Sequence, residues 1–349
     1  MRIPEQVLLA AAEEILLRLG EERTGAETAA RYLVRADMRG VSTHGVNLLR
    51  LVAQRAEAGM LSLPTRVSVV REDAATAVLD GGNGLGPIGA RRALDAAARK
   101  AGEYGIGMAA LRNTNNVGAL GCVSSEAARK GFIVVVTTNG NPSVAPFGAA
   151  DPFFGTNPVS IAVPVGKRDP IVLDMSSSIV ARGKIRLASL SGQPIPEGWA
   201  LDGEGNPTTD PKAALKGCLL PLGGAKGSGL AMMVDILSGM LSGSAYGRKL
   251  RSFHELDGPT GVGASFLCID VGRFLDPEAF ESAVTEYAAQ IRALRRQPGF
   301  EEILLPGELE SRREEESARL GIEVPEAVVR EIEGIFAKLG CAARLGAAV

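Results

Sequence analysis

The spacing of apolar residues changes twice along this chain, and that change restricts the fold more than any other feature. From Pro4 to about Gly59 the apolar residues recur at helical spacing, and from about residue 67 short runs typical of β-strands replace them. After Arg273 the helical spacing returns. We therefore predict a helical lobe with an N-terminal part at 1–66 and a C-terminal part at 273–349. An α/β domain at 67–272 lies between them.

The middle segment contains several runs that predict buried or half-buried strands. An alanine-rich stretch, ARRALDAAARKAGEYG, predicts a helix. The predicted strands are VSVV, TAVLD, FIVVVTT, PVSIAVPV and PIVLDMS.

Composition excludes some classes of protein. The 349 residues carry a formal net charge of -2 and only 4% aromatic residues, so neither a basic stripe nor stacking platforms for nucleic acid are expected. Glu13, Glu14 and Arg18 interrupt the first apolar run, so we expect neither a signal peptide nor a membrane span. Widely scattered cysteines favour reduced core residues, no metal site and a cytoplasmic protein. They are Cys122, Cys218, Cys268 and Cys341.

The chain has only two histidines, which makes the search for an acid–base group short. His44 lies in ADMRGVSTHGVNLLR, between charged and glycine residues. Histidine is the side chain most often used for proton transfer near neutral pH. The alternative is that His44 packs or caps a helix end. His254 lies in the polar stretch GRKLRSFHELDG, which predicts a surface loop.

Two glycine-rich tracts are candidates for phosphate binding. Gly84 to Gly89 fits G-x-G-x-x-G, but Pro87 removes an amide where a phosphate cradle needs donors, so we disfavour a Rossmann-type role. In PLGGAKGSGLAMMVDILSGMLSG, glycines precede Lys226 and a run predicted to form a buried helix from Gly227 to Leu241. Its amides and the ammonium group suit an anion, whereas the alternative is a tight turn with Lys226 in solvent. Asp235 is expected to be a structural acid with a buried partner.

A third tract follows the end of a predicted strand, the usual place for ligand groups in α/β proteins. It is IVLDMSSSIVARGKI, which contains Asp174, Met175 and Ser176. Arg182 and Lys184 follow closely, and either they bind an anionic substrate or they form a solvated face.

Seven tracts in this order resemble the malate/L-lactate dehydrogenase family of the second type. They are ADMRGVSTHG, RNTNNVGALG, NPSVAPFGAADPFFGTNPVSIAVP, IVLDMSSSIVARGKI, IPEGWALDGEGNPTTDP, LLPLGGAKGSGLAM and LLPGELESRR. The resemblance implies an α/β (α+β) fold with a non-Rossmann NAD(P)-binding mixed sheet and a discontinuous helical lobe. It also implies NAD or NADP as cofactor, a small-molecule substrate and a homodimer. Substrates in this family are small 2-oxo/2-hydroxy acids or cyclic imino acids.

The resemblance also implies roles for individual residues. His44 becomes the proton donor or acceptor, with Thr43 to orient it and Asn116 in the neighbouring loop. Arg50, Arg182 and Gly183 lie in stretches implied to contact substrate. The implied cofactor residues are Asn116, Val117, Gly118, Ala119, Leu120, Gly140, Asp174, Met175, Ser176, Lys226, Gly227, Pro306, Gly307 and Glu308.

Two positions depart from the family pattern. Asn116 stands where the family commonly has a histidine, and an amide cannot titrate. Leu48 stands where the family often has an arginine for the substrate carboxylate. The sequence therefore leaves open a nucleotide-binding protein of the same fold without dehydrogenase activity. It also leaves open the particular substrate and the choice between NAD and NADP.

Overall fold

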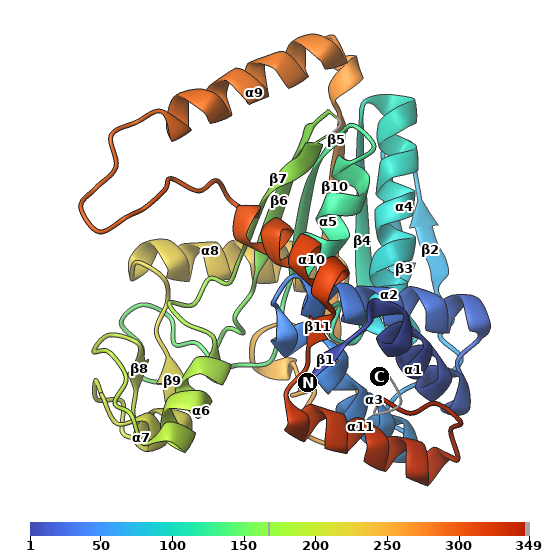
Figure 1. Ribbon diagram of the computed structural model, residues 1–349, viewed down its shortest axis with the longest axis vertical. Helices are drawn as coiled ribbons and strands as arrows, with labels where there is room; N and C mark the ends of the chain where they lie inside the picture. Colours follow the sequence, from blue (N-terminus) through green and yellow to red (C-terminus); the bar gives the residue numbers. More distant parts are fainter. Residues whose placement is uncertain (167, 346–349) are drawn as a thin grey trace.

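A seven-stranded mixed sheet forms the centre of the computed structural model, which describes residues 1–166 and 168–345 (Figure 1). Only β3 and β4 run parallel, and the other neighbouring strands are antiparallel. In sheet order the strands are β2 (Ser68–Glu72), β3 (Thr76–Asp80), β4 (Ile106–Thr114), β10 (Val262–Asp270), β5 (Phe132–Thr138), β6 (Val159–Val165) and β7 (Arg168–Met175). This mixed order confirms the predicted fold class and differs from the parallel sheet of a Rossmann domain.

The two central strands, β4 and β10, were not among the strands that the sequence predicted. Both are rich in Gly, Ala and Ser, which have weak strand propensity. Helix α4 (Gly86–Tyr104) packs directly on them, and a side chain at Gly107 would clash with its backbone. Close packing of the helix therefore selects small residues at the centre of the sheet.

Both ends of the chain contribute to a second core beside the sheet. Helices α1 (Glu5–Arg18), α2 (Arg23–Met38) and α3 (Leu49–Glu57) bury apolar residues together with α11 (Glu326–Leu339). Strand β1 (Arg2–Ile3) pairs antiparallel with β11 (Ile322–Glu323). In Figure 1 the blue and red segments accordingly lie together. The boundaries at residues 66 and 272 stay a prediction.

Further elements cover the edges and ends of the sheet. Helix α5 (Leu120–Ala128) packs on β5, β6 and β7, and α10 (Glu308–Leu320) contacts α2 and β7. Helix α9 (Pro277–Arg292) contacts β6 and projects at the top of Figure 1. A smaller unit contains α6 (Arg182–Ser191), α7 (Pro211–Lys216), β8 (Ala200–Leu201) and β9 (Cys218–Leu219). Within the described ranges, no helix combines the length and apolar character that crossing a membrane requires.

Helix α8 (Ala225–Asp235), continued by a π-helical segment Ile236–Met240, differs from the buried helix that the sequence predicted for 227–241. One face is buried, but the opposite face exposes a stripe of apolar side chains. The stripe consists of Met232, Met233, Ile236, Leu237, Met240 and Leu241. Asp235 has buried partners, as predicted: it accepts hydrogen bonds from Asn139 Nδ2 and the Gly247 amide, both at 2.9 Å.

Candidate active site

His44 lies on a pair of short 3₁₀ turns, Ser42–His44 and Val46–Leu48, that connect α2 to α3. Its Nδ1 is 3.0 Å from the hydroxyl oxygen of Thr43. The half-buried imidazole is surrounded by protein, and burial lowers the pKa of His44 below its ordinary 6.5. A neutral imidazole held by a hydroxyl group is therefore expected near pH 7.

Asp37 fixes the loop that carries His44, and the sequence analysis did not identify it. Its carboxylate accepts a hydrogen bond of 2.7 Å from the Val46 amide. A side chain at Gly45 would collide with this carboxylate, so the loop requires glycine there. Burial raises the pKa of Asp37 to about 7. Its position seven residues before His44, in the last turn of the predicted helix, was an available signal.

Asp174 stands at the end of β7 and at the start of α5. Its Oδ2 accepts a 2.6 Å hydrogen bond from the Gly121 amide, in the first turn of that helix. Solvent reaches the side chain although protein surrounds it, which indicates a concave position. Burial raises the pKa of Asp174 to about 6, while the Gly121 hydrogen bond and the charge of Arg39 oppose that shift.

The structure brings the predicted cofactor tracts together around the end of β7. Asp174 contacts the start of α5 through Gly121, and Val172 donates a 3.1 Å hydrogen bond to the Pro306 carbonyl just before α10. The Leu222 amide, in the loop before α8, donates to Ser177 at 2.9 Å. Tracts that are far apart in sequence therefore form one site.

Open backbone at three glycines marks where a ligand can approach this site. A side chain built at Gly118, Gly140 or Gly223 would meet no protein atom within 4 Å. Gly118 is held in its turn by the Asn116 side chain, which accepts its amide hydrogen bond at 2.9 Å. Lys226, in the first turn of α8, is exposed. These features leave room for a phosphate-bearing ligand, and the assignment of these residues to cofactor binding stays a prediction.

Protein atoms occupy the space beside the other glycine motif, at residues 84–89. Side chains at Gly84 and Gly86 would collide with Thr65 and with the backbone of Asn116, respectively, and one at Gly89 would press on Leu111. The motif at 84–89 therefore packs the start of α4 against its neighbours, in agreement with the interpretation that disfavoured a Rossmann role.

The predicted cofactor tract 306–308 borders a pocket beside β7. A polar pocket of about 550 Å³ lies between β7, α9 and α10, and Pro306, Gly307 and Glu308 line it. The Glu308 carboxylate accepts the Leu305 amide at 2.8 Å and pairs with Arg292. From β7 the pocket is lined by residues 168–171, the part of the strand opposite the end that carries Asp174.

The predicted substrate residues take different positions. Gly183 lies beside the catalytic loop, because a side chain there would be 3.6 Å from the Thr43 methyl group. Arg182 donates to the Leu215 carbonyl at 2.6 Å, in the direction of α7. Arg50 hydrogen bonds to Gln54 at 3.2 Å and lies 3.4 Å from the Glu331 carboxylate. Both arginine side chains therefore have partners within the protein.

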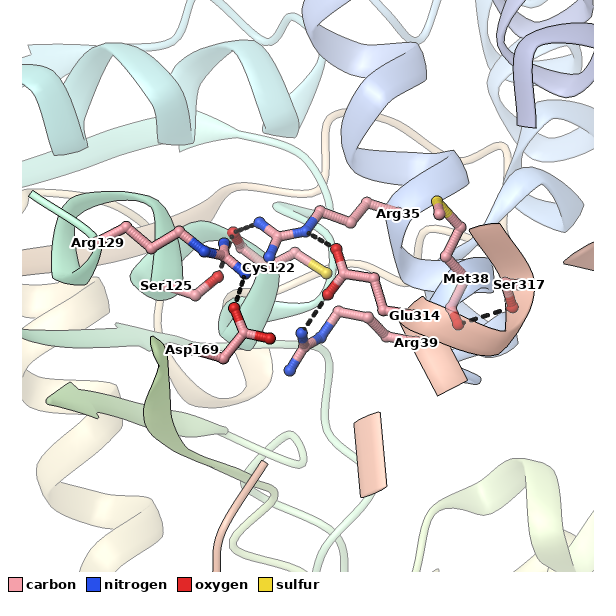
Figure 2. Close-up of polar contacts among 9 residues, drawn as sticks. All are labelled: Arg35, Met38, Arg39, Cys122, Ser125, Arg129, Asp169, Glu314 and Ser317. Atoms are coloured by element: carbon pink, nitrogen blue, oxygen red, sulfur yellow. Dashed lines mark hydrogen bonds and ion pairs between the residues drawn. The ribbon is translucent and has the colours of Figure 1, made fainter. Parts of the chain in front are cut away.

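An ion-pair network joins the helix before His44 to the helix after the Pro306–Glu308 tract (Figure 2). Arg35 and Arg39 of α2 bind the two oxygens of Glu314 on α10, at 2.7 and 2.6 Å. Arg35 also donates to the Cys122 carbonyl of α5 at 3.1 Å. The network fixes α2, α5 and α10 relative to one another, and no sequence motif indicated it.

The mixed sheet and the tracts that meet at the end of β7 define an α/β protein with one candidate acid–base histidine and a candidate nucleotide site. The chain belongs to the malate/L-lactate dehydrogenase family, whose model matches residues 3–333, and it is an oxidoreductase.

Individual relatives cover nearly the whole chain. A malate dehydrogenase from Pyrococcus horikoshii is 36% identical over 348 residues, covering 97% of this chain and 96% of that protein. A (2R)-3-sulfolactate dehydrogenase (NADP(+)) from Chromohalobacter salexigens is 36% identical over 334 residues, covering 95% and 96%. The solved sulfolactate dehydrogenase from Methanocaldococcus jannaschii has a TM-score of 0.92 at 34% identity, covering 97% and 98%.

Proposed function

We propose that this protein uses NAD or NADP to transfer hydride between nicotinamide and a small 2-oxo/2-hydroxy acid, or a cyclic imino acid. The observation that supports this most directly is His44, whose ring is held by Thr43 in a loop that lies beside the start of α6. Family relatives carry names that specify NAD(+) or NADP(+).

The residues fit a dinucleotide. The space beside Gly118 and Gly223 is open, Lys226 offers a positive charge, and the pocket beside Pro306–Glu308 has room for a further part of the cofactor. We assign cofactor contact to the tracts 116–120, 174–176, 226–227 and 306–308 and to Gly140. A bound nicotinamide would supply or accept the hydride.

His44 performs the proton transfer in this proposal. In reduction its imidazolium donates a proton to the substrate oxygen or nitrogen, and in oxidation the neutral ring accepts it. Thr43 orients the ring through Nδ1, which leaves Nε2 for the substrate. Asn116 holds the adjacent turn instead of exchanging a proton.

The molecular context is also part of the proposal. We infer a homodimer, which the family resemblance implies and which the exposed apolar stripe on α8 supports. We infer a cytoplasmic protein because its four cysteines are buried and unpaired.

Replacing His44 by glutamine tests the assignment. The amide keeps much of the ring's volume and hydrogen bonding but cannot exchange a proton, so kcat should fall by about 10²–10⁴-fold. Affinity for NADH or NADPH, measured by fluorescence titration, should remain within about twofold, because the lost interaction belongs to the transition state. In wild type, kcat/KM for oxidation should rise with pH through a pKa below 6.5, because the neutral ring is the base. In His44→Gln this step should disappear.

Two outcomes would contradict the proposal. A His44→Gln variant that keeps more than about a third of wild-type kcat, under conditions where hydride transfer limits the rate, would show that another group carries the proton. Cofactor binding without turnover of any 2-oxo acid or cyclic imine would favour a nucleotide-binding protein without dehydrogenase activity.

A further inference from the structure

The residue at position 48 cannot bind a substrate carboxylate in this chain. Leu48 is buried and lines a narrow apolar pocket together with Val52, Leu61 and Phe253. Asn116 borders the same pocket, so position 48 lies next to the site although its side chain is apolar. A 2-oxo acid still brings a carboxylate into the site, and burying that charge without a cation would be costly.

Helix α6 places another arginine, Arg186, on the side that faces the loop 42–48, which carries His44 and is called the catalytic loop below. Gly183, in its first turn, lies against Thr43. Residues three apart share one face of a helix, so Arg186 follows Gly183 on that face, one turn further along. The Arg186 side chain is exposed, and it forms no ion pair with any residue in the described ranges.

A second segment, the loop 251–258, approaches the same place and is fixed by Arg55. This guanidinium is fully buried and has no carboxylate partner among the described residues. It donates to the carbonyls of Glu255 at 2.5 Å and Gly258 at 2.6 Å, and it lies 5.2 Å from the centre of the Phe253 ring. The anchored loop places Phe253 beside Leu48 and Asn116 in the apolar pocket, and the charges of Arg50 and Arg186 act on the neighbouring His254.

Arg186 has no ion-pair partner among the described residues, whereas Glu331 pairs with Arg50. Burial, followed by the charges of Arg50 and Arg186, lowers the pKa of His254 below its ordinary 6.5, and Glu255 opposes this shift. The Arg186 guanidinium is therefore available to bind an anion.

We propose that Arg186 binds the substrate carboxylate and takes the role of the arginine that is absent at position 48. The inference rests on the proposed function and adds the residue that selects acids over their neutral analogues. The guanidinium can bind both carboxylate oxygens at once. Arg50 adds a positive charge nearby without being required as a direct ligand.

The test compares an acid with its neutral amide. In wild type, kcat/KM for pyruvate should exceed that for pyruvamide, and Arg186→Gln should reduce this ratio about ten- to a hundredfold through KM for pyruvate. Arg186→Lys, which keeps the charge but loses the planar fork, should restore part of the ratio. Lys212→Gln removes an exposed charge from α7, which packs on α6, and should leave the ratio unchanged.

Binding of oxamate to the enzyme saturated with NADH or NADPH, measured by calorimetry, gives an independent readout. Arg186→Gln should weaken oxamate about ten- to a hundredfold and leave cofactor affinity unchanged. If wild type turns over pyruvate or binds oxamate and Arg186→Gln does so equally well, the Arg186 assignment is wrong and the proposed function stands. If wild type neither binds oxamate nor turns over any 2-oxo acid or cyclic imino acid, both fail.

Discussion

Burial shifts the pKa values of two ionisable groups at the loop 42–48 in the direction that favours their uncharged forms. The pKa of His44 is lowered, so the ring is mostly neutral near pH 7, whereas the pKa of Asp37 is raised to about 7, so its carboxyl group is about half protonated there. Asp37 accepts the Val46 amide and so holds the loop, and in the proposed function His44 exchanges the proton with the substrate. A neutral imidazole suits a residue that must gain and lose one proton.

The shift of Asp37 predicts how stability depends on pH. Between its ordinary pKa of 3.8 and about 7, the folded chain keeps a proton that the unfolded chain has released. The contribution of Asp37 to the free energy of unfolding is therefore fully present below about pH 4, and it is lost as the pH rises to 7. Asp37→Asn retains an oxygen for the Val46 amide but does not titrate. We expect the variant to gain about 1–2 kcal/mol relative to wild type between pH 5 and pH 8, after allowing for partial exposure.

Urea unfolding of both proteins at pH 5 and pH 8 measures this difference. Parallel pH dependence in wild type and variant would show that Asp37 does not titrate in this range.

At the scale of elements, glycines at two helix starts have opposite uses. At α4 the glycines allow protein backbone to come close, because Gly86 lies against the Asn116 carbonyl. At α8 the preceding Gly223 faces open space and Lys226 follows in the first turn. Similar composition therefore produces close packing at one helix and an open, exposed turn at the other, because different segments of the chain lie beside the two helix starts.

Gly86→Ala should accordingly destabilise the fold without a specific loss of cofactor binding. The added methyl group overlaps backbone that has little freedom to move, and overpacking of this kind typically costs about 1–3 kcal/mol. A lowered Tm with NADH affinity unchanged at a temperature where the variant is folded is the expected result. Unchanged Tm together with weakened NADH binding would instead support a phosphate-binding role for Gly84–Gly89.

At the scale of the whole molecule, most of the large apolar residues of α8 that face solvent lie on one surface. The stripe from Met232 to Leu241 is six apolar side chains long, and each is at least 37% exposed. Apolar patches of this length on a folded chain commonly mark an interface. A two-fold axis that pairs the stripe with its copy would bury both.

Light scattering should therefore give about twice the 36.3 kDa chain mass. Leu237→Glu places a charge in the centre of the stripe and should shift the protein toward monomer at micromolar concentration. Leu190→Glu, on the exposed face of α6, is the matched control and should leave the mass unchanged. A monomeric wild type would refute the dimer, and a dimeric Leu237→Glu variant would place the interface elsewhere.

The sequence predicted those strands and helices that the local spacing of apolar residues determines. Alternating and continuous apolar runs predicted β3, β5, β6 and β7, and helical spacing predicted the terminal helices. It did not predict β4 and β10, because small residues chosen for the close approach of α4 lack strand propensity. His44 and the cofactor tracts followed from motifs, whereas Asp37, Arg186 and the Arg35–Arg39–Glu314 network depend on contacts between distant segments. Such contacts leave no periodic signal in one sequence.

The pairing of β1 with β11 has a consequence for the chain during its synthesis. Arg2 lies opposite Glu323, so the first helices made complete their core only after residues near the end have been translated. At a translation rate of about 5–20 residues per second, α11 is synthesised on the order of tens of seconds after α1 and α2, whose apolar faces lack this partner until then. The sheet domain can form during that interval, because its strands lie within residues 68–270. The catalytic loop is thus among the first segments to leave the ribosome, but its helical surroundings are completed only as translation ends.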